Sequence, residues 1–244
     1  MGKTIFLKQL NNLSSFNRND LFQAMQSTMP NLTQANFKVR LNQLLAGGEV
    51  MRVGRNAYTV CNGNIKEYSY EYSKDTLELV KVIEENYPLL DFRIFELVQL
   101  NEFLNHQIAH NTTFVFVEED LGAFVFDTLK EDYQGKLLIN PTVELYHQYW
   151  TEDMVVILKM ATEAPKGKFE KWHTCIEKLM VDIYCEKILL STYSIAEQQN
   201  IFANIFEHYI VDESRLFRYA RRRGVEKTLK NFLKNEAKID LRLG

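Results

Sequence analysis

The chain has 244 residues, of which 46% are hydrophobic and 25% charged, and its formal net charge is −3. This length and composition are typical of a globular protein with room for one small and one medium domain, and they argue against disorder. No stretch approaches the ~20 apolar residues of a membrane span and the N-terminal segment is too polar for a signal peptide, so we expect a cytoplasmic protein with no membrane partner.

Three helices are predicted at the N-terminal end. Residues 5–13 have the apolar spacing of a first helix. A second helix begins at Asn19 or Asp20, either of which can cap it, and ends at Pro30, because the residue before a proline disfavours α geometry. The third helix is predicted over 33–45, with Thr33 as its N-cap.

Two glycines end the third helix, and residues 50–60 are predicted to form a β-hairpin around a Gly54-Arg55-Asn56 turn. A helix followed by a glycine stop and a basic hairpin is the order of a winged helix-turn-helix, which places one helix in the major groove of DNA and a β-wing against the backbone. Arg55 at the hairpin tip is then placed for a phosphate or the minor groove. Residues 1–60 are therefore predicted to be a DNA-binding domain.

The third helix has an exposed face that suits the reading of bases. Its apolar stripe recurs at i, i+4, i+7 and i+8 from Phe37, so the opposite face is exposed. Asparagine and glutamine can read adenine, and a small apolar side chain can contact a thymine methyl. The exposed face holds Ala35, Asn36, Lys38, Val39, Asn42 and Gln43, with Arg40 on its flank.

Residues 61–74 are interpreted as a linker, whose alternating tyrosines are also typical of an edge strand. Residues 75–244 are interpreted as an α/β domain, in which Ser73 caps the first helix. Strands and helices then alternate, which predicts a sheet covered by helices. The strands are expected at 91–98, 113–117, 136–139 and 154–158, with helices at 100–106, 121–130 and after Pro141. From Trp172 onward the pattern is helical, over 176–190, 195–209, 213–223 and 225–234.

The last two helices carry basic stripes. The stripe residues are Arg215, Arg218, Arg221 and Arg222, followed by Lys227, Lys230 and Lys234. They predict a second polyanion-binding surface, separate from the first 60 residues, unless nearby acids neutralise it. Positive charge is concentrated at both ends of the chain. Residues 1–60 and 212–244 each carry a net charge of +5, and the residues between them carry −13.

No catalytic motif is found. The sequence has no Gly-Ser turn with paired aspartates, no phosphate-binding loop and no G-x-S-x-G elbow. Glu118, Glu119 and Asp120 follow a predicted strand, where α/β enzymes hold metals, but the same place suits helix caps, and we interpret them as caps or surface acids. Asp182 is interpreted as a buried structural acid with an arginine or a backbone donor as partner.

The cysteines and histidines show no metal-ligand pattern. Cys61, Cys175 and Cys185 form no close pair, and an odd number suits a reducing compartment. His106 and His110 are four residues apart but lack the carboxylate of a zinc motif, so they are interpreted as surface histidines. We therefore expect no metal, no cofactor and no catalytic residue, and the chain is predicted not to be an enzyme.

The segment LTQANFKVRLNQLLAGGEVMRVGRNAYTV resembles the N-terminal winged helix of AbiE-type antitoxins, the regulator half of type IV toxin–antitoxin systems. IEKLMVDIYCEK and ESRLFRYARRRG resemble stretches of their C-terminal domain. One departure is Asn56-Ala57 before Tyr58, where the family has a glycine closer to the tyrosine.

The resemblance implies an AbiEi-like antitoxin of an abortive-infection system, a transcriptional repressor that binds the operator of its own operon. It implies a nucleotidyltransferase-like toxin as partner. It also implies DNA contacts by Thr33, Asn36, Lys38, Arg40, Gln43, Arg52 and Arg55.

Two alternatives stay open. One is a nuclease-like enzyme that uses the acids at 118–120 and is targeted to DNA by the winged helix. The other is a transcription factor whose acidic α/β domain binds a small effector. A nucleotidyltransferase-like reading frame immediately downstream would favour the antitoxin.

Overall fold

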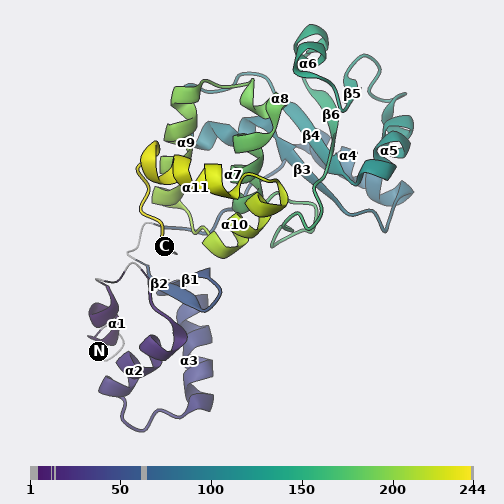
Figure 1. Ribbon diagram of the computed structural model, residues 1–244. Helices are drawn as coiled ribbons and strands as arrows, with labels where there is room; N and C mark the ends of the chain where they lie inside the picture. Colours follow the sequence, from purple (N-terminus) through teal and green to yellow (C-terminus); the bar gives the residue numbers. More distant parts are fainter. Residues whose placement is uncertain (1–4, 12, 14, 62–64, 243–244) are drawn as a thin grey trace.

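The computed structural model describes residues 5–11, 13, 15–61 and 65–242, except for the side chain of Glu119. It shows a mixed α/β chain with two sheets, in which a small unit of three helices and a hairpin projects from one end of a larger body (Figure 1). None of the helices in the described ranges is long and apolar enough to cross a membrane.

The small unit is built from α1 (Ile5–Leu10), α2 (Arg18–Thr28) and α3 (Gln34–Ala46). Their apolar sides share one core with Phe37 at its centre, fully buried in an edge-on contact with the Phe22 ring at 5.1 Å. The core forms because the apolar positions of each helix recur with the helical period and fall on one side.

The predicted cap of α3 is confirmed and that of α2 is wrong. The Thr33 hydroxyl accepts the Asn36 N–H at 3.3 Å. At α2 the cap is Asn17, whose side chain accepts the N–H groups of Asn19 and Asp20, while the Asp20 carboxylate accepts the Asn17 N–H at 2.8 Å. The Asp20 side chain therefore completes a capping box at the third helical position, which leaves the cap itself to the residue three earlier.

The predicted hairpin is present. Strands β1 (Val50–Gly54) and β2 (Ala57–Val60) pair antiparallel, and Asn56 takes the left-handed backbone of the turn with φ 56°. Phe16 exchanges two backbone hydrogen bonds of 2.8 Å with Tyr58, so the chain before α2 is tied to the hairpin.

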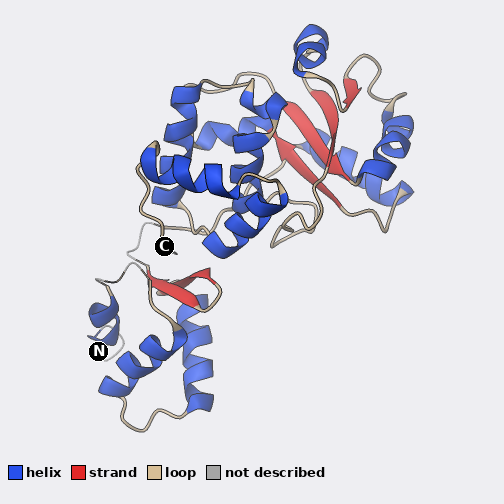
Figure 2. Ribbon diagram, in the orientation of Figure 1, coloured by secondary structure: helices blue, strands red, loops and turns tan. Residues whose placement is uncertain are grey.

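The body contains a four-stranded sheet in the order β3-β4-β6-β5 (Figure 2). Its strands are β3 (Phe92–Glu96), β4 (Thr112–Val117), β5 (Leu137–Ile139) and β6 (Met154–Lys159). β3 runs antiparallel to β4, and the other neighbours are parallel. The helices that link β4, β5 and β6 make parallel pairing possible, since a parallel connection needs a crossover.

Helices cover both faces of the sheet, because successive strand residues point to opposite sides. Ile94, Val115 and Ile157 pack with α4 (Lys74–Asn86) and α5 (Gly122–Leu129) on one face. Residues such as Phe95, Phe114 and Val156 pack on the other face with the later helices. These are α6 (Val143–Tyr149), α7 (Ile176–Cys185), α8 (Lys187–Leu190), α9 (Ile195–His208), α10 (Glu213–Arg222) and α11 (Glu226–Asn235).

Two predicted boundaries are wrong. The strand expected over 91–98 ends at Glu96, and the helix expected over 100–106 is a 3-10 turn, η1 (Leu97–Glu102). The Glu96 carboxylate is fully buried and accepts hydrogen bonds from the Tyr70, Ser73 and Thr76 hydroxyls at 2.5 Å each. These partners lie about 20 residues earlier in the chain. Because the residues that bind Glu96 are distant in the chain, the residues next to Glu96 do not indicate that the strand ends there.

The described part of the 61–74 segment is attached to the body. Lys66 exchanges backbone hydrogen bonds with His208 and Ile210, and the Tyr72 hydroxyl donates to the Ile94 carbonyl at 3.0 Å. Ser73 caps α4, as expected. Residues 62–64 lie outside the described residues.

Candidate nucleic-acid interface

The exposed face of α3 lines an open groove beside the turn between α2 and α3. Asn36, Val39, Arg40 and Gln43 form the helical side of this groove, and residues 29–32 form the other. All four side chains are exposed, and Val39 is 56% accessible although it is apolar. Three of the residues on the predicted base-reading face, Asn36, Val39 and Gln43, therefore lie together with Arg40.

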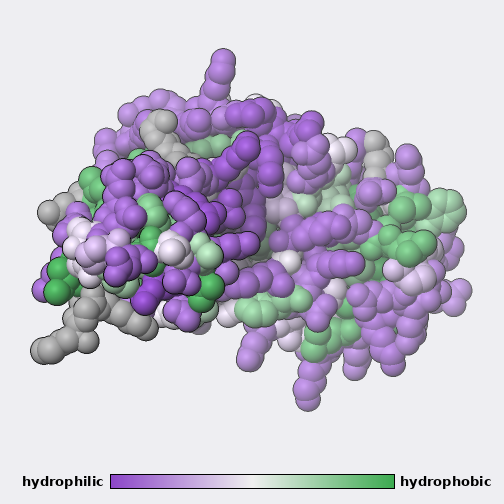
Figure 3. All heavy atoms as spheres, turned by 90° about the horizontal axis from the view of Figure 1, so that it is seen from below, coloured by the Kyte–Doolittle hydropathy of each residue, from purple (hydrophilic) through white to green (hydrophobic). Residues whose placement is uncertain are grey.

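The cations on α3 are free to meet an external anion. Lys38 and Arg40 are exposed, and within the described ranges neither lies within salt-bridge distance of a carboxylate. Seen from the end where these helices lie, the molecule shows a mostly hydrophilic surface with small hydrophobic spots (Figure 3). A polar, locally positive face of this kind suits a polyanion.

The hairpin does not stand free. One side of it packs against the body, where Met51, Val53 and Ala57 are buried next to Ile65 and Ile210. The Arg55 N–H donates to the Ser214 hydroxyl of α10 at 3.0 Å, while the Arg55 side chain is exposed.

Arg52 faces a different space from α3. It lines a cavity of about 220 Å³ between the hairpin and the body, together with Lys168 of a body loop and Arg215 of α10. Its Nε donates to the Gly54 carbonyl at 3.0 Å. The structure thus separates Arg52 from the α3 face, and keeps Arg55 accessible at the tip.

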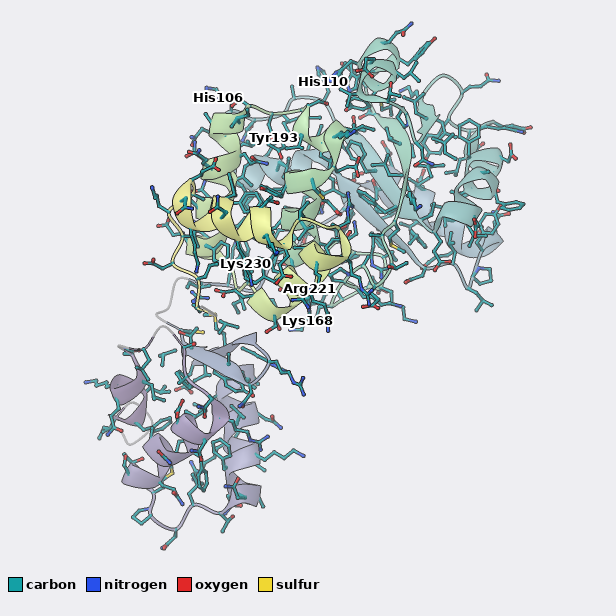
Figure 4. The ribbon with its side chains drawn as sticks, in the orientation of Figure 1. His106, His110, Lys168, Tyr193, Arg221 and Lys230 are labelled. Carbon is teal, nitrogen blue, oxygen red and sulfur yellow. The ribbon has the colours of Figure 1, made fainter. Side chains whose placement is uncertain are left out.

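Four of the seven cations of the second basic surface have an acidic partner. Arg221 and Lys230 both pair with Glu226, at 2.6 and 3.2 Å, and the Arg221 hydrogen bond lowers the pKa of Glu226 to about 2. Arg222 pairs with Glu163, and Arg215 lies 3.6 Å from the buried Glu177. Figure 4 shows Arg221 and Lys230 on neighbouring helices.

Three members of that set, Arg218, Lys227 and Lys234, have no carboxylate partner in the described part of the chain, and all three are exposed. Arg218 lies one helical turn beyond Ser214, on the same face of α10. Ser214 holds the Arg55 backbone and α10 packs on β1, so Arg218 lies on the helix that meets the hairpin. That the second basic surface binds polyanions separately from the first 60 residues stays a prediction.

Asp182 has the structural role predicted for it. Its carboxylate pairs with Lys178 on α7, and accepts from the Tyr219 hydroxyl and the Arg223 guanidinium at 2.9 Å each. Arg223 also pairs with Glu186 at 3.0 Å. In the sequence Arg223 is one residue of a basic run, and its neighbours in the chain do not indicate that its side chain binds a buried acid.

The described side chains of the acids at 118–120 form no site. Glu118 and Asp120 are exposed, and Glu118 at the start of η2 (Glu119–Leu121) makes no side-chain cap hydrogen bond, so the capping interpretation is wrong for it. Helix α5 also begins without a side-chain cap at Leu121. Among the described residues, no group of three or more histidines, cysteines and acids could hold a metal ion.

The histidines and cysteines behave as ordinary side chains. His106 and His110 lie at the end of the body away from the N-terminal helices (Figure 4), next to Glu197 and Glu152 at 3.4 and 2.9 Å. Burial raises the pKa of the Cys175 and Cys185 thiols to about 12. At neutral pH they are therefore thiols and not thiolates.

Residues 36–239 match the model of a family of unknown function, DUF6577, and the chain belongs to that family. No curated protein matches the chain. Among solved structures it is similar to the RV2827C protein from Mycobacterium tuberculosis, with a TM-score of 0.25 and 10% identity over 98% of this chain and 82% of that one. Similarity at this level supports no conclusion about function.

Proposed function

We propose that residues 1–60 form a winged helix-turn-helix that binds duplex DNA, and that the chain is a cytoplasmic transcriptional regulator. The observation that carries this proposal is the exposed face of α3, where the Asn36 and Gln43 amides, Val39 and the unpaired Arg40 line one groove. An α-helix of this kind fits the major groove, in which amides can pair with adenine.

In this proposal the hairpin is the wing, and it contacts DNA through its tip. Arg55 meets a backbone phosphate next to the site that α3 reads, and Arg218 extends the same contact along α10. The proposed DNA contacts are Thr33, Asn36, Lys38, Arg40, Gln43, Arg52 and Arg55, of which Arg52 lines the cavity between the hairpin and the body.

We further propose that the regulator is an AbiEi-like antitoxin that represses its own operon, with a nucleotidyltransferase-like toxin as partner. The resemblance of residues 32–60 to that family supports this. Gel shifts with DNA from upstream of the gene test the repressor, and co-purification with the product of a neighbouring reading frame tests the partner. Weak binding that ignores sequence would contradict the repressor.

Arg55→Ala is expected to weaken binding to all DNA sequences alike and to reduce the salt slope by about one unit, because it removes one phosphate contact. The variant keeps the Arg55 N–H that bonds Ser214, so the hairpin should stay in place. The measurement is affinity against salt concentration, with Lys74→Ala on α4 as the control, because Lys74 is an exposed cation of the body with no carboxylate partner among the described residues. A loss confined to particular base pairs would show that Arg55 reads sequence instead.

Arg218→Ala is expected to weaken binding to a long operator and to spare a minimal core site. The Arg221→Ala/Arg222→Ala double variant should have a smaller effect, because those cations already have carboxylate partners. Melting temperatures should shift little, as exposed charges contribute little to folding. If Arg218→Ala binds long DNA as tightly as the unmodified protein, α10 is not part of the DNA interface.

We also propose that the chain has no metal-dependent catalysis of its own. Incubation with Mg²⁺ or Mn²⁺ and labelled DNA, RNA and nucleotides should give no turnover. Turnover that Glu118→Gln abolishes would instead establish the nuclease-like alternative.

A further inference from the structure

The segment after α11 returns to the N-terminal unit. Residues 236–242, called the strap here, leave α11 with backbone bonds from Ala237 and Ile239 back to the helix. Leu241 packs against the core of the body. Figure 1 shows the strap running from α11 toward the N-terminal unit.

The strap bonds both parts of the molecule through the backbone of Arg242. The Arg242 N–H donates to the fully buried carboxylate of Glu213 on α10 at 2.8 Å. The Arg242 carbonyl accepts from the hydroxyl of Ser15, just before α2, at 3.2 Å. One residue thus connects the body to the N-terminal unit.

Among the described residues, the rest of the contact between the two parts includes the buried side of the hairpin, the packing of α10 on β1 and the hydrogen bond between the Arg55 N–H and Ser214. Contacts between two units of one chain usually permit relative motion, so a bond that bridges the units helps to hold them.

The closed arrangement also carries a cost. The Nη1 of Arg242 is buried and has no hydrogen-bond partner among the described residues. A buried donor without a partner opposes the arrangement that buries it. The strap therefore combines two bonds that favour closure with one buried group that opposes it.

We propose that the strap is a releasable latch, which holds the hairpin against α10 and lets it leave when the Arg242 backbone bonds break. The latch goes beyond DNA binding, and it is a property of the free protein. In a chain that binds DNA as proposed, it sets the position of α3 relative to Arg218.

Hydrogen exchange of the full chain without DNA tests the latch. The reporter is the peptide over 50–56, which contains the Arg55 amide. Arg242→Pro deletes the N–H donated to Glu213, and exchange of the reporter should become roughly tenfold faster or more, as expected when a hydrogen bond to a charged group is removed. Arg242→Ala keeps that N–H and removes the buried guanidinium, so exchange should match or fall below that of the unmodified protein.

Asp240→Pro is the matched control, since it places a proline in the strap at an exposed position with no backbone bond to either part. Unchanged exchange in Arg242→Pro overturns the latch, and so does equal acceleration in Asp240→Pro. Faster hydrogen exchange in β4 reports loss of the whole fold. If Arg242→Pro also makes β4 exchange faster, the test of the latch passes to Ser15→Ala. It should accelerate the reporter, while Ser27→Ala, whose hydroxyl bonds within α2, should not. No acceleration in Ser15→Ala then overturns the proposal.

Discussion

Asp182→Ala is expected to lower the free energy of unfolding by about 3–5 kcal/mol, because it leaves the Lys178 ammonium buried without its partner. Lys178 is fully buried, and its Nζ lies 3.5 Å from the centre of the Phe116 ring. Burial lowers the pKa of Lys178, and the adjacent Asp182 opposes that shift. The same substitution removes the acceptor of the Tyr219 hydroxyl and one partner of Arg223.

Chemical denaturation of Asp182→Ala and of the unmodified protein measures this loss of unfolding free energy. Glu226→Ala is the control, since it also removes a carboxylate shared by two cations, but at the surface. Surface pairs contribute little, so its loss should be much smaller. Similar losses in the two variants would show that α7 and α10 do not depend on the buried network.

Asn36→Ala and Gln43→Ala are expected to relax the preference for individual base pairs, by ~1–3 kcal/mol for each bidentate pair of hydrogen bonds to a base that the substitution removes. Both side chains line the α3 groove and are exposed, so the substitutions should leave the fold intact. Competition binding against operators with single base changes measures the effect.

Asn200→Ala is the control for this pair. It removes an exposed amide from α9 of the body, which does not line the α3 groove. Base preference should therefore stay as in the unmodified protein. A uniform loss of affinity for every sequence in Asn36→Ala and Gln43→Ala would contradict base reading by α3.

The sequence by itself determined most helices and strands of this protein and several of their ends. The third helix and its cap Thr33, the hairpin turn at Asn56 and the cap Ser73 all follow from residues within one or two helical turns. Helix capping, turn backbone and apolar period depend on such short distances along the chain, so the sequence carries them directly. The structural role of Asp182 could also be predicted, from its apolar neighbours.

Only the tertiary structure decided which charges are free and which surface the hairpin offers. The Arg55 bond to Ser214 spans 159 residues and the Ser15 bond to Arg242 spans 227. Lysine and arginine side chains are long, and on a helix face they look alike whether they point to solvent, as Arg218 does, or to a buried acid, as Arg223 does. Their partners come from elements that meet only when the sheet and its covering helices have packed.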